Sequence, residues 1–547
     1  MSESNPGTGR WFGLGFLAVG LAMIIVDATI VNVAVPSIIA DLQIAATDAE
    51  WINTVYSLVF AALLISVGRI GDLIGRKRVY LGGLVLFVLA SLLCGAVPSG
   101  GWLIAARALQ GIGAALILPS TLSSVNAMFR GRERGIAFGI WGSVIGGMAA
   151  LGPLVGGWLT TSYSWHWAFY VNLPIGVVAF AGTALLVPET RDPAAQRGLD
   201  PLGIALSSTG FAALVFGLIE GERYGWLRPA MPFRIGDWSW PLSSLSPVPV
   251  ALGLAALLIP LFFAHQRWRG DRGRPVLVDL ALFRYRSFRW GNLTALIVSL
   301  GEFGMVFVLP LFLQAVLGYS AFETGIVLLA LAAGAFIAGP AAAGLAQRFG
   351  PRRVVTAGMA LEAVGLLGLA ALLSPETSGI RLAPALLVYG VGVGLATRQL
   401  TSVILAEVPA TRSGQASGIQ STTRQIGSAL GIAILGTLLA AGLATSTRDR
   451  LEGIPGIPQA QVIEISQLVK RTAGQVLPEL RRQPGSEPVV EAIEEAFTWA
   501  ARRDAVVAAG FILVGFAASW LLPDVSGLQR QAGAAETVET AVGRPSS

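Results

Sequence analysis

An acidic residue stands in the middle of an apolar run. Asp27 lies in "IIVDATIVNVAVP" (24–36), within a run over residues 11–39. A helix crosses a bilayer with about 20 apolar residues, and a carboxylate at mid-depth costs roughly 2.5–3.5 kcal/mol. Burial favours the neutral acid and a nearby cation favours the carboxylate, so one buried acid can exchange a proton for a cationic ligand. The alternative is structural: Asp27 bonds neighbouring helices, through Thr29 or Asn32, and never titrates.

A basic residue is the natural partner for that acid. Arg107 lies in the otherwise apolar "WLIAARALQGIGAALILPS" (102–120). An arginine inside a membrane normally faces the bundle interior or a partner, which predicts an Asp27–Arg107 pair. The alternative is that Arg107 extends to the nearby external surface. Glu302, in "SLGEFGMVF", is the predicted second acid of the same cavity, with a packing role as its alternative.

Polar and aromatic residues in the same runs are candidates for a substrate cavity. Aromatic faces attract lipophilic cations, whereas a buried arginine favours an anionic group. For each residue, ordinary helix packing is the alternative. The candidates are Asn32, Trp51, Tyr56, Gln110 and Arg398, and Glu362 is a less central acid in the second half of the chain.

Composition places these residues in a membrane protein. Of 547 residues, 54% are hydrophobic and 13% are charged, about half the charged fraction of soluble domains. Two histidines and one cysteine provide neither a disulfide framework nor a metal site, so we expect no cofactor. The chain lacks G-x-x-x-x-G-K-[ST] and a nucleophile–base pair, so we expect neither nucleotide-driven transport nor an enzyme. The net charge of +6 indicates membrane topology rather than nucleic-acid binding.

Hydropathy predicts fourteen membrane-spanning helices in an all-α fold. The predicted spans are 12–38, 51–68, 79–97, 102–126, 136–159, 166–187, 201–219, 248–265, 289–315, 323–346, 354–373, 382–405, 416–443 and 501–522. An even number places both termini on one side of the membrane. Basic connections such as 68–78 and 347–353 alternate with uncharged or acidic ones, so the positive-inside rule makes the basic side and both termini cytoplasmic.

Two connections on the predicted external side are long. Segment 444–500 has six basic and eight acidic residues, and "QAQVIEISQLVK" within it predicts a short amphipathic helix. Long translocated segments obey the positive-inside rule weakly, so the topology stands. The Trp-rich segment 221–243 is predicted to rest at the membrane interface.

An internal repeat divides the chain into halves. Gly111, Gly113, Gly135 and Gly139 each match a glycine 279 residues later, and Gly75 matches Gly350 at an offset of 275. Repeated halves are typical of transporters that rock about a central site. We therefore expect a six-helix bundle at 1–187, a linker with two inserted helices at 188–288, a second bundle at 289–523 that includes the external segment, and a disordered cytoplasmic tail at 524–547.

Several motifs, in order, resemble those of the major facilitator superfamily. They are "GRIGDLIGRKR" (68–78), "ARALQGIGAALILPS" (106–120) and "GGMAALGPLVGG" (146–157), and "WHWAFYVNLPIG" (165–176), "LFLQAVLGYSAFETG" (311–325) and "TTRQIGSALGIA" (422–433) resemble its fourteen-helix drug:proton antiporter branch. The likeness spans residues 12–443 and the last helix. It implies two pseudo-symmetric six-helix bundles with two inserted helices, and makes Arg107 an element of proton coupling.

Two of these motifs imply roles for particular residues. In the first, glycines permit close helix approach and an acid can accept hydrogen bonds at a helix N-terminus. The resemblance makes it a latch that keeps the inside closed, whereas the alternative is that its basic residues only set topology. The latch residues are Gly68, Arg69, Asp72, Gly75, Arg76 and Arg78. Gly152, Pro153, Gly156 and Gly157 form the antiporter motif, which implies a bend that controls leak, with tight packing as the alternative.

The function predicted from these residues is proton-coupled secondary active efflux of lipophilic, cationic small molecules by alternating access. An exporter of an endogenous metabolite, antibiotic, amino acid or lipid is the alternative, and a non-transporting sensor or scaffold is a third reading. The expected partners are a small-molecule substrate, protons and the lipid bilayer, with no nucleic acid. We expect a multi-pass protein of the cell membrane that functions as a monomer.

Overall fold

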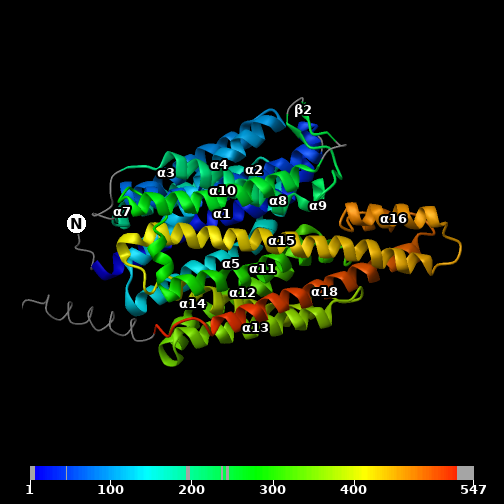
Figure 1. Ribbon diagram of the computed structural model, residues 1–547. Helices are drawn as coiled ribbons and strands as arrows, with labels where there is room; N and C mark the ends of the chain where they lie inside the picture. The colour runs from blue at the N-terminus through cyan, green and yellow to red at the C-terminus, as the bar shows by residue number, and fades with distance from the viewer. Residues whose placement is uncertain (1–5, 45, 192–197, 236–237, 242–244, 526–547) are drawn as a thin grey trace, which may run out of the picture.

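Long, nearly parallel helices make up almost the whole structure (Figure 1). The computed structural model describes residues 6–44, 46–191, 198–235, 238–241 and 245–525. The predicted tail, 524–547, lies outside the described residues from 526 onward. The elements are α1 Pro6–Leu42, α2 Ala46–Ile74, α3 Arg76–Ala96, α4 Gly100–Met128, α5 Gly131–Ser162, α6 Trp167–Tyr170, α7 Asn172–Leu186, α8 Pro201–Ile219, α9 Gly221–Tyr224, β1 Arg234–Ile235, β2 Trp238–Ser239, α10 Pro247–Asp271, η1 Leu280–Arg284, α11 Arg286–Ala315, α12 Ala321–Phe349, α13 Pro351–Leu372, α14 Gly379–Ile404, η2 Ala410–Arg412, α15 Ser413–Glu452, α16 Gln459–Arg471, α17 Leu477–Leu480 and α18 Glu487–Ser519.

Twelve helices within the described residues are long and apolar enough to cross a membrane. The other two predicted spans, 136–159 and 501–522, lie in α5 and α18, which pack within the bundle but are not among the twelve. In α18 the charged residues Arg502, Arg503 and Asp504 shorten the apolar stretch. The helical membrane fold is therefore confirmed, and the count of fourteen stays a prediction.

Local sequence explains where the helices begin and end. Gly75 and Gly350, matched by the repeat, both have positive φ angles, 114° and 88°, in the turns between α2 and α3 and between α12 and α13. Residues with a side chain rarely adopt this conformation, so glycine permits two helices to follow each other directly. Pro351 occupies the first turn of α13, where its missing N–H costs nothing.

The repeat is visible in the packing. A side chain at Gly111 or Gly113 of α4 would meet Tyr56 of α2 or Phe87 of α3. Their matches in α14, Gly390 and Gly392, face α12 and α13 in the same way. Small residues thus allow the fourth helix of each half to pack closely against the second and third. Between the halves, α5 packs against α12 and α2 against α15, an exchange expected of two related bundles.

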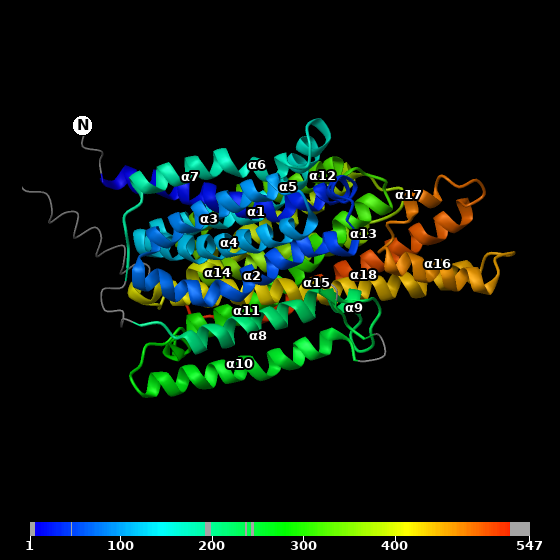
Figure 2. The same ribbon diagram turned by 90° about the horizontal axis from the view of Figure 1, so that it is seen from above.

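Helices α8 and α10 form a hairpin at one edge of the molecule, with α8 against α2 and α15 and α10 outermost (Figure 2). At one end of the hairpin Asp200 caps α8 by accepting the N–H of Gly203 at 3.0 Å. It also accepts hydrogen bonds from His265 Nε2 at 3.0 Å and Gln266 Nε2 at 2.8 Å, both on α10. The domain boundaries predicted from the sequence stay predictions.

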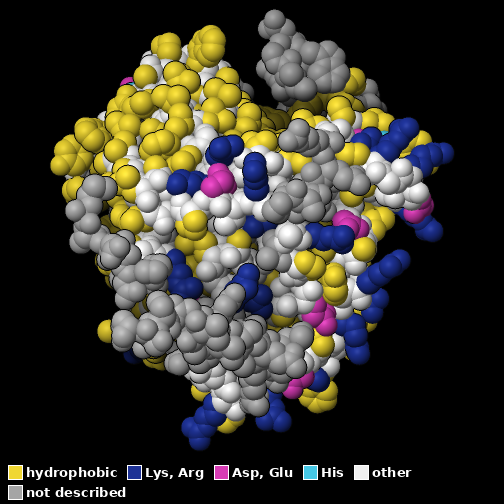
Figure 3. Space-filling view, turned by 90° about the vertical axis from the view of Figure 1, so that its left-hand side faces the viewer, with side chains coloured by type: hydrophobic (Ala, Val, Ile, Leu, Met, Phe, Trp, Pro, Cys, Tyr) yellow, Lys and Arg dark blue, Asp and Glu magenta, His cyan; other side chains and the backbone are white. Residues whose placement is uncertain are grey.

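Both ends of the described chain lie at the same end of the bundle, opposite α16 (Figure 1). Lys and Arg side chains gather on that end (Figure 3). The predicted amphipathic helix in the segment 444–500 is present as α16. At the same end as α16, the described residues of the predicted interfacial segment 221–243 include α9 and the antiparallel pair β1 and β2, with Arg234 opposite Ser239 and Ile235 opposite Trp238.

Candidate functional site

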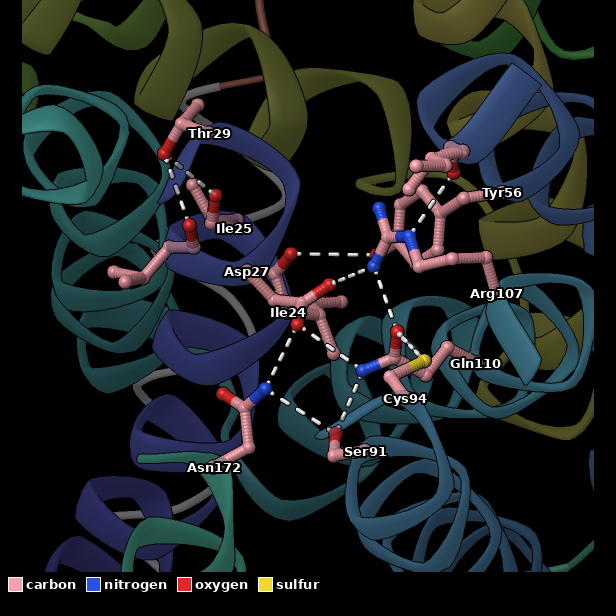
Figure 4. A network of polar contacts seen from close by, with 12 residues as sticks. Ile24, Ile25, Asp27, Thr29, Tyr56, Ser91, Cys94, Arg107, Gln110 and Asn172 are labelled. Carbon is pink, nitrogen blue, oxygen red and sulfur yellow. Dashed lines mark hydrogen bonds and ion pairs between the residues drawn. The ribbon is translucent and has the colours of Figure 1, made fainter. Parts of the chain in front are cut away.

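Asp27 and Arg107 are in contact inside the first half (Figure 4). Arg107 Nη1, on α4, donates to Asp27 Oδ2, on α1, at 2.5 Å, and both side chains are fully buried. The structure therefore contains the predicted contact. The guanidinium does not extend to the surface, because it also donates from Nε to the carbonyl of Ile52 on α2 at 3.1 Å.

Amide side chains complete the surroundings of the carboxylate. Gln110 Nε2 and Asn172 Nδ2 donate to Asp27 Oδ1 at 3.1 and 2.7 Å, respectively. Both amides also donate to Ser91 Oγ on α3, at 2.6 and 3.2 Å. Helices α1, α3, α4 and α7 thus converge on one acid, and each oxygen of Asp27 has a donor, as an ionised carboxylate requires.

The cation has contacts of its own. Its guanidinium carbon lies 4.2 Å from the centre of the Tyr56 ring, in a cation–π geometry. Arg107 Nη1 also donates to Gln110 Oε1 at 2.7 Å, which fixes the amide orientation that faces Asp27. Arg107 Nη2 has no partner among the described residues. One nitrogen is thus left over for a group that enters this site.

Sequence reasoning found four members of this group and missed three. Asp27, Tyr56, Arg107 and Gln110 were predicted, whereas Ser91, Cys94 and Asn172 were not. Cys94 Sγ donates to Gln110 Oε1 at 3.3 Å. Asn172 stands in the quoted motif "WHWAFYVNLPIG", and that is the one signal that could have identified it.

The structural alternative for Asp27 finds no support in Thr29. That hydroxyl donates to the carbonyls of Ile25 and Val26 in its own helix, at 3.2 and 3.1 Å. The side chain of Asn32 lies outside the described residues. Because Asp27 is fully buried in this conformation, a proton or a ligand reaches it only after the surrounding helices move.

Two candidates for the cavity wall lie elsewhere. Trp51, at the start of α2, packs against Phe216 and Phe233, with ring centres 6.1 and 5.9 Å away. It belongs to an aromatic cluster beneath the 221–243 segment. Arg398, in α14, donates to the carbonyl of Ala335 in α12, and its stem covers Gly142 of α5. Its Nε and Nη1 have no partner among the described residues, at the junction between the halves.

The predicted second acid lies in the other half. Glu302 of α11 is buried, with one oxygen 3.9 Å from Arg424 Nη2 of α15. Tyr389, the repeat counterpart of Gln110, donates to the backbone carbonyl of Glu302 at 3.2 Å. Glu362 of α13 is fully buried, and neither of its carboxylate oxygens has a partner in the described part of the chain. The structure does not bring these acids into contact with Asp27.

The residues of the first motif join the two halves at the end where both termini lie. Asp72 accepts the backbone N–H groups of Gly414 and Gln415, at the start of α15, both at 3.0 Å. Arg76 Nη2 donates to Asp72 at 2.8 Å and to the carbonyl of Thr411 at 3.5 Å. A side chain at Gly68 would meet the backbone of Gly414, so only glycine permits this approach.

The outer members of that motif face away from the junction. Arg78 is exposed and pairs with Glu189 at 3.8 Å, whereas Arg69 is buried. Gly75 provides the turn between α2 and α3. Beside Asp72, Asn126 Nδ2 of α4 donates to Ser413 Oγ at 2.7 Å, a further hydrogen bond between the halves that the sequence did not predict.

The glycines of the antiporter motif set the distance between α5 and its neighbours. A Cβ at Gly152 or Gly156 would collide with Thr29 or Ile30, two or three residues after Asp27 in α1. Gly157 faces Phe322 of α12 across the other side of the helix. The side chain of Pro153 lies outside the described residues. Helix α5 therefore contacts both the helix of the buried acid and the second half.

Comparison with known proteins agrees with this architecture. Residues 17–432 match the family model described as Major Facilitator Superfamily. The chain is 34% identical to "Multidrug resistance protein Stp" of Mycobacterium tuberculosis over 507 residues, which cover 92% of this chain and 90% of that one. It is 32% identical to "Tetracenomycin C resistance and export protein" of Streptomyces glaucescens over 442 residues, covering 80% and 78%.

A solved structure shares the fold at low sequence identity. The human organic anion transporter MFSD10 (TETRAN) superposes with a TM-score of 0.57 at 13% identity, over 94% of this chain and 99% of that one. At this identity the likeness concerns the fold alone.

Proposed function

The chain belongs to the major facilitator superfamily and is thus a membrane transporter rather than an enzyme, and from this premise we propose that it exports lipophilic, cationic small molecules in exchange for protons. The observation that carries the proposal is the fully buried Asp27–Arg107 pair, whose carboxylate accepts further hydrogen bonds from Gln110 of α4 and Asn172 of α7. The multidrug resistance relative supports the substrate class.

Protonation of Asp27 is the proposed switch. In the closed state the carboxylate and guanidinium neutralise each other, so no net charge is buried. A proton on Asp27 leaves Arg107 without its counter-charge, and an uncompensated buried charge costs about 3–5 kcal/mol. That cost favours an opening in which water reaches Arg107. A cation that enters the opened site then competes with the proton for the same carboxylate, which is antiport.

The inward movement of one proton supplies enough free energy to export one substrate molecule against a concentration gradient. A membrane potential supplies about 2.3 kcal/mol per elementary charge for each 100 mV. Glu302, close to Arg424 in the second half, is the proposed second element of the proton path. The free nitrogens of Arg398 at the junction between the halves are proposed to face the substrate cavity after opening.

The Asp72 cluster is the proposed latch. It closes the end that contains both termini and a gathering of basic side chains (Figure 3), which we propose is cytoplasmic. A structure closed at that end corresponds to an outward-facing or occluded state. Alternating access then requires the bonds of Asp72 to Gly414 and Gln415 to break once in each cycle.

Export of a metabolite made by the same cell is the second candidate. It is favoured by the likeness to a tetracenomycin C exporter and by the unpaired nitrogens of Arg398, which suit an anionic group. The two proposals differ in the charge of the preferred compound, so a pair of probes separates them.

The test is transport by the purified full-length protein in proteoliposomes with an imposed pH gradient. Ethidium serves as the lipophilic cation and tetracenomycin C as the aromatic metabolite. We expect ethidium movement that collapses with the gradient and is abolished by Asp27→Asn. The matched control is Asp271→Asn, because Asp271 is 75% exposed at the end of α10. Full activity in Asp27→Asn would reject the switch, and movement of tetracenomycin C alone would favour metabolite export.

A further inference from the structure

A basic groove of about 770 Å³ opens in the second half, between the α12–α13 turn and the end of α18. It lies at the same end of the molecule as both termini, where α13 and α18 pack side by side. Its lining includes three arginines, two aromatic side chains and one acid: Arg348, Arg352, Arg353, Phe516, Trp520 and Asp524.

The equivalent turn of the first half, between α2 and α3, shows how its basic residues are paired. In the first half, Arg76 pairs with Asp72, and Arg78 pairs with Glu189. Lys77 Nζ donates to the carbonyl of Ala184 at 2.7 Å, and the Glu189 carboxylate also accepts two backbone N–H groups at the start of α3. Each of these three basic residues of the first half thus has a carboxylate or a backbone carbonyl of the protein as its partner.

The second half lacks this compensation. At the offset that relates Gly75 to Gly350, Asp72 corresponds to the neutral Gln347. Asp524 follows the last helix as Glu189 does in the first half, and its carboxylate lies 4.0 Å from where a Cβ on Gly350 would be. No ion pair of Arg352 or Arg353 occurs within the described residues, so one acid faces three cations across the groove.

The groove continues into an apolar surface. Trp520 is 63% exposed and packs against Phe516, with ring centres 6.2 Å apart. Tryptophan prefers the interface between headgroups and hydrocarbon. Further along α18 toward the middle of the bundle, Leu513 and Val514 are exposed. On the α13 side the groove is lined by Ala360, whose side chain is small. A charged head and an apolar tail therefore fit the same groove.

We propose that this groove binds the headgroup of an anionic phospholipid, with the arginines on the phosphate and an acyl chain along α13 and α18. Guanidinium groups recognise phosphate oxygens through paired N–H donors, and basic pockets between membrane helices bind anionic headgroups on the cytoplasmic side. The leaflet rests on the orientation proposed above, but the binding itself does not depend on that orientation or on transport.

The test uses purified full-length protein in detergent, with native mass spectrometry to count bound lipid. Phosphatidylglycerol is titrated against phosphatidylethanolamine, which carries phosphate without net negative charge. We expect wild type to retain phosphatidylglycerol selectively and the double variant Arg352→Gln/Arg353→Gln to bind it about thirtyfold more weakly. The control is Arg272→Gln/Arg274→Gln, an exposed pair of arginines at the same end of the molecule.

Three results would overturn the proposal. An equal loss of phosphatidylglycerol binding in both double variants would mean that general surface charge, rather than this groove, attracts the lipid. Equal retention of phosphatidylethanolamine would show that the groove does not select an anionic headgroup. Displacement of the lipid by millimolar inorganic phosphate alone would make the groove a free-anion site. An unchanged thermal unfolding temperature of each variant excludes misfolding, and Asp27→Asn protein is expected to bind phosphatidylglycerol normally, which separates this proposal from the transport mechanism.

Discussion

Asp72 and Gln415 are 343 residues apart in the sequence, yet the Asp72 carboxylate accepts the Gln415 backbone N–H at 3.0 Å. The neighbouring N–H of Gly414 donates to the other oxygen of the same carboxylate. Backbone N–H groups at a helix start lack partners within the helix and carry a partial positive charge, so an anion stabilises them. One side chain of the first half therefore caps a helix of the second.

Asp72→Asn is expected to slow turnover about tenfold while leaving substrate affinity nearly unchanged. The amide keeps one acceptor but presents N–H groups to the second backbone donor, and hydrogen bonds to a charged group contribute roughly 1.5–3 kcal/mol. Turnover and KM for ethidium in proteoliposomes measure the effect. Arg78→Gln, in the same motif but exposed and directed away from α15, is the control. A large loss of affinity with normal turnover would contradict the latch.

Gly68→Ala is expected to separate α2 from α15 at the closed end. The atoms that a new methyl group would meet belong to the backbone of Gly414, which cannot move without the helix. We expect an increased distance between spin labels on the two helices and reduced transport. Gly82→Ala on α3 is the matched control, since nothing lies within 4 Å of a Cβ there. Unchanged distances in Gly68→Ala would show that the junction tolerates the extra volume.

Arg107→Gln should lower the free energy of unfolding by about 3–5 kcal/mol, because it leaves the Asp27 carboxylate buried without its cation. Adding Asp27→Asn should recover most of that loss without restoring transport. Thermal unfolding in detergent of the two single variants and the double variant provides the comparison. If the double variant were as unstable as Arg107→Gln alone, the contacts with Ile52 and Tyr56 would matter more than the pair.

The Asp200 cluster predicts an acid-dependent loss of stability. Burial raises the pKa of Asp200, but hydrogen bonds from His265, Gly203 and Gln266 outweigh it, so the pKa is lowered overall. A carboxyl with a depressed pKa stabilises the fold above its unfolded pKa of about 3.9 and loses that contribution as the pH falls through its folded pKa. Asp200→Asn should therefore lower the unfolding temperature at pH 7, and the difference from wild type should begin to shrink as the pH falls below about 4 and vanish once the pH is below the folded pKa of Asp200. A constant difference across that range would contradict the ionic role.

Helices were predictable because each apolar run is long and each turn has a clear signal, such as Gly75 or Pro351. Their ends were less predictable. The span predicted at 416–443 is the middle of α15, which continues to Glu452 because its last turns pack on α16 rather than on lipid. The span predicted at 501–522 belongs to a helix that begins at Glu487, since polar residues can extend a helix beyond the hydrocarbon.

Both charged residues of the site were predictable, whereas only two of its neutral residues, Tyr56 and Gln110, were predicted. Asp27 and Arg107 stand out because a charge in an apolar run is expensive, so few explanations compete. Ser91 and Asn172 carry no such signal, since hydroxyl and amide side chains occur in many membrane helices. Trp51 was predicted as a wall residue but packs under the 221–243 segment, a long-range contact that periodicity does not contain.

Helix α15 runs without a break for 40 residues, about 60 Å at 1.5 Å per residue and twice the hydrocarbon thickness. The backbone N–H groups of its first turn donate to Asp72, and its far end packs against α16. In α16, Lys470 pairs with Glu222 of α9 at 3.4 Å. A continuous helix of this length can carry a displacement from one end to the other. If α16 lies outside the cell, as the proposed orientation requires, a molecule that binds α16 and the end of α15 should bias which way the transporter faces without having to cross the membrane.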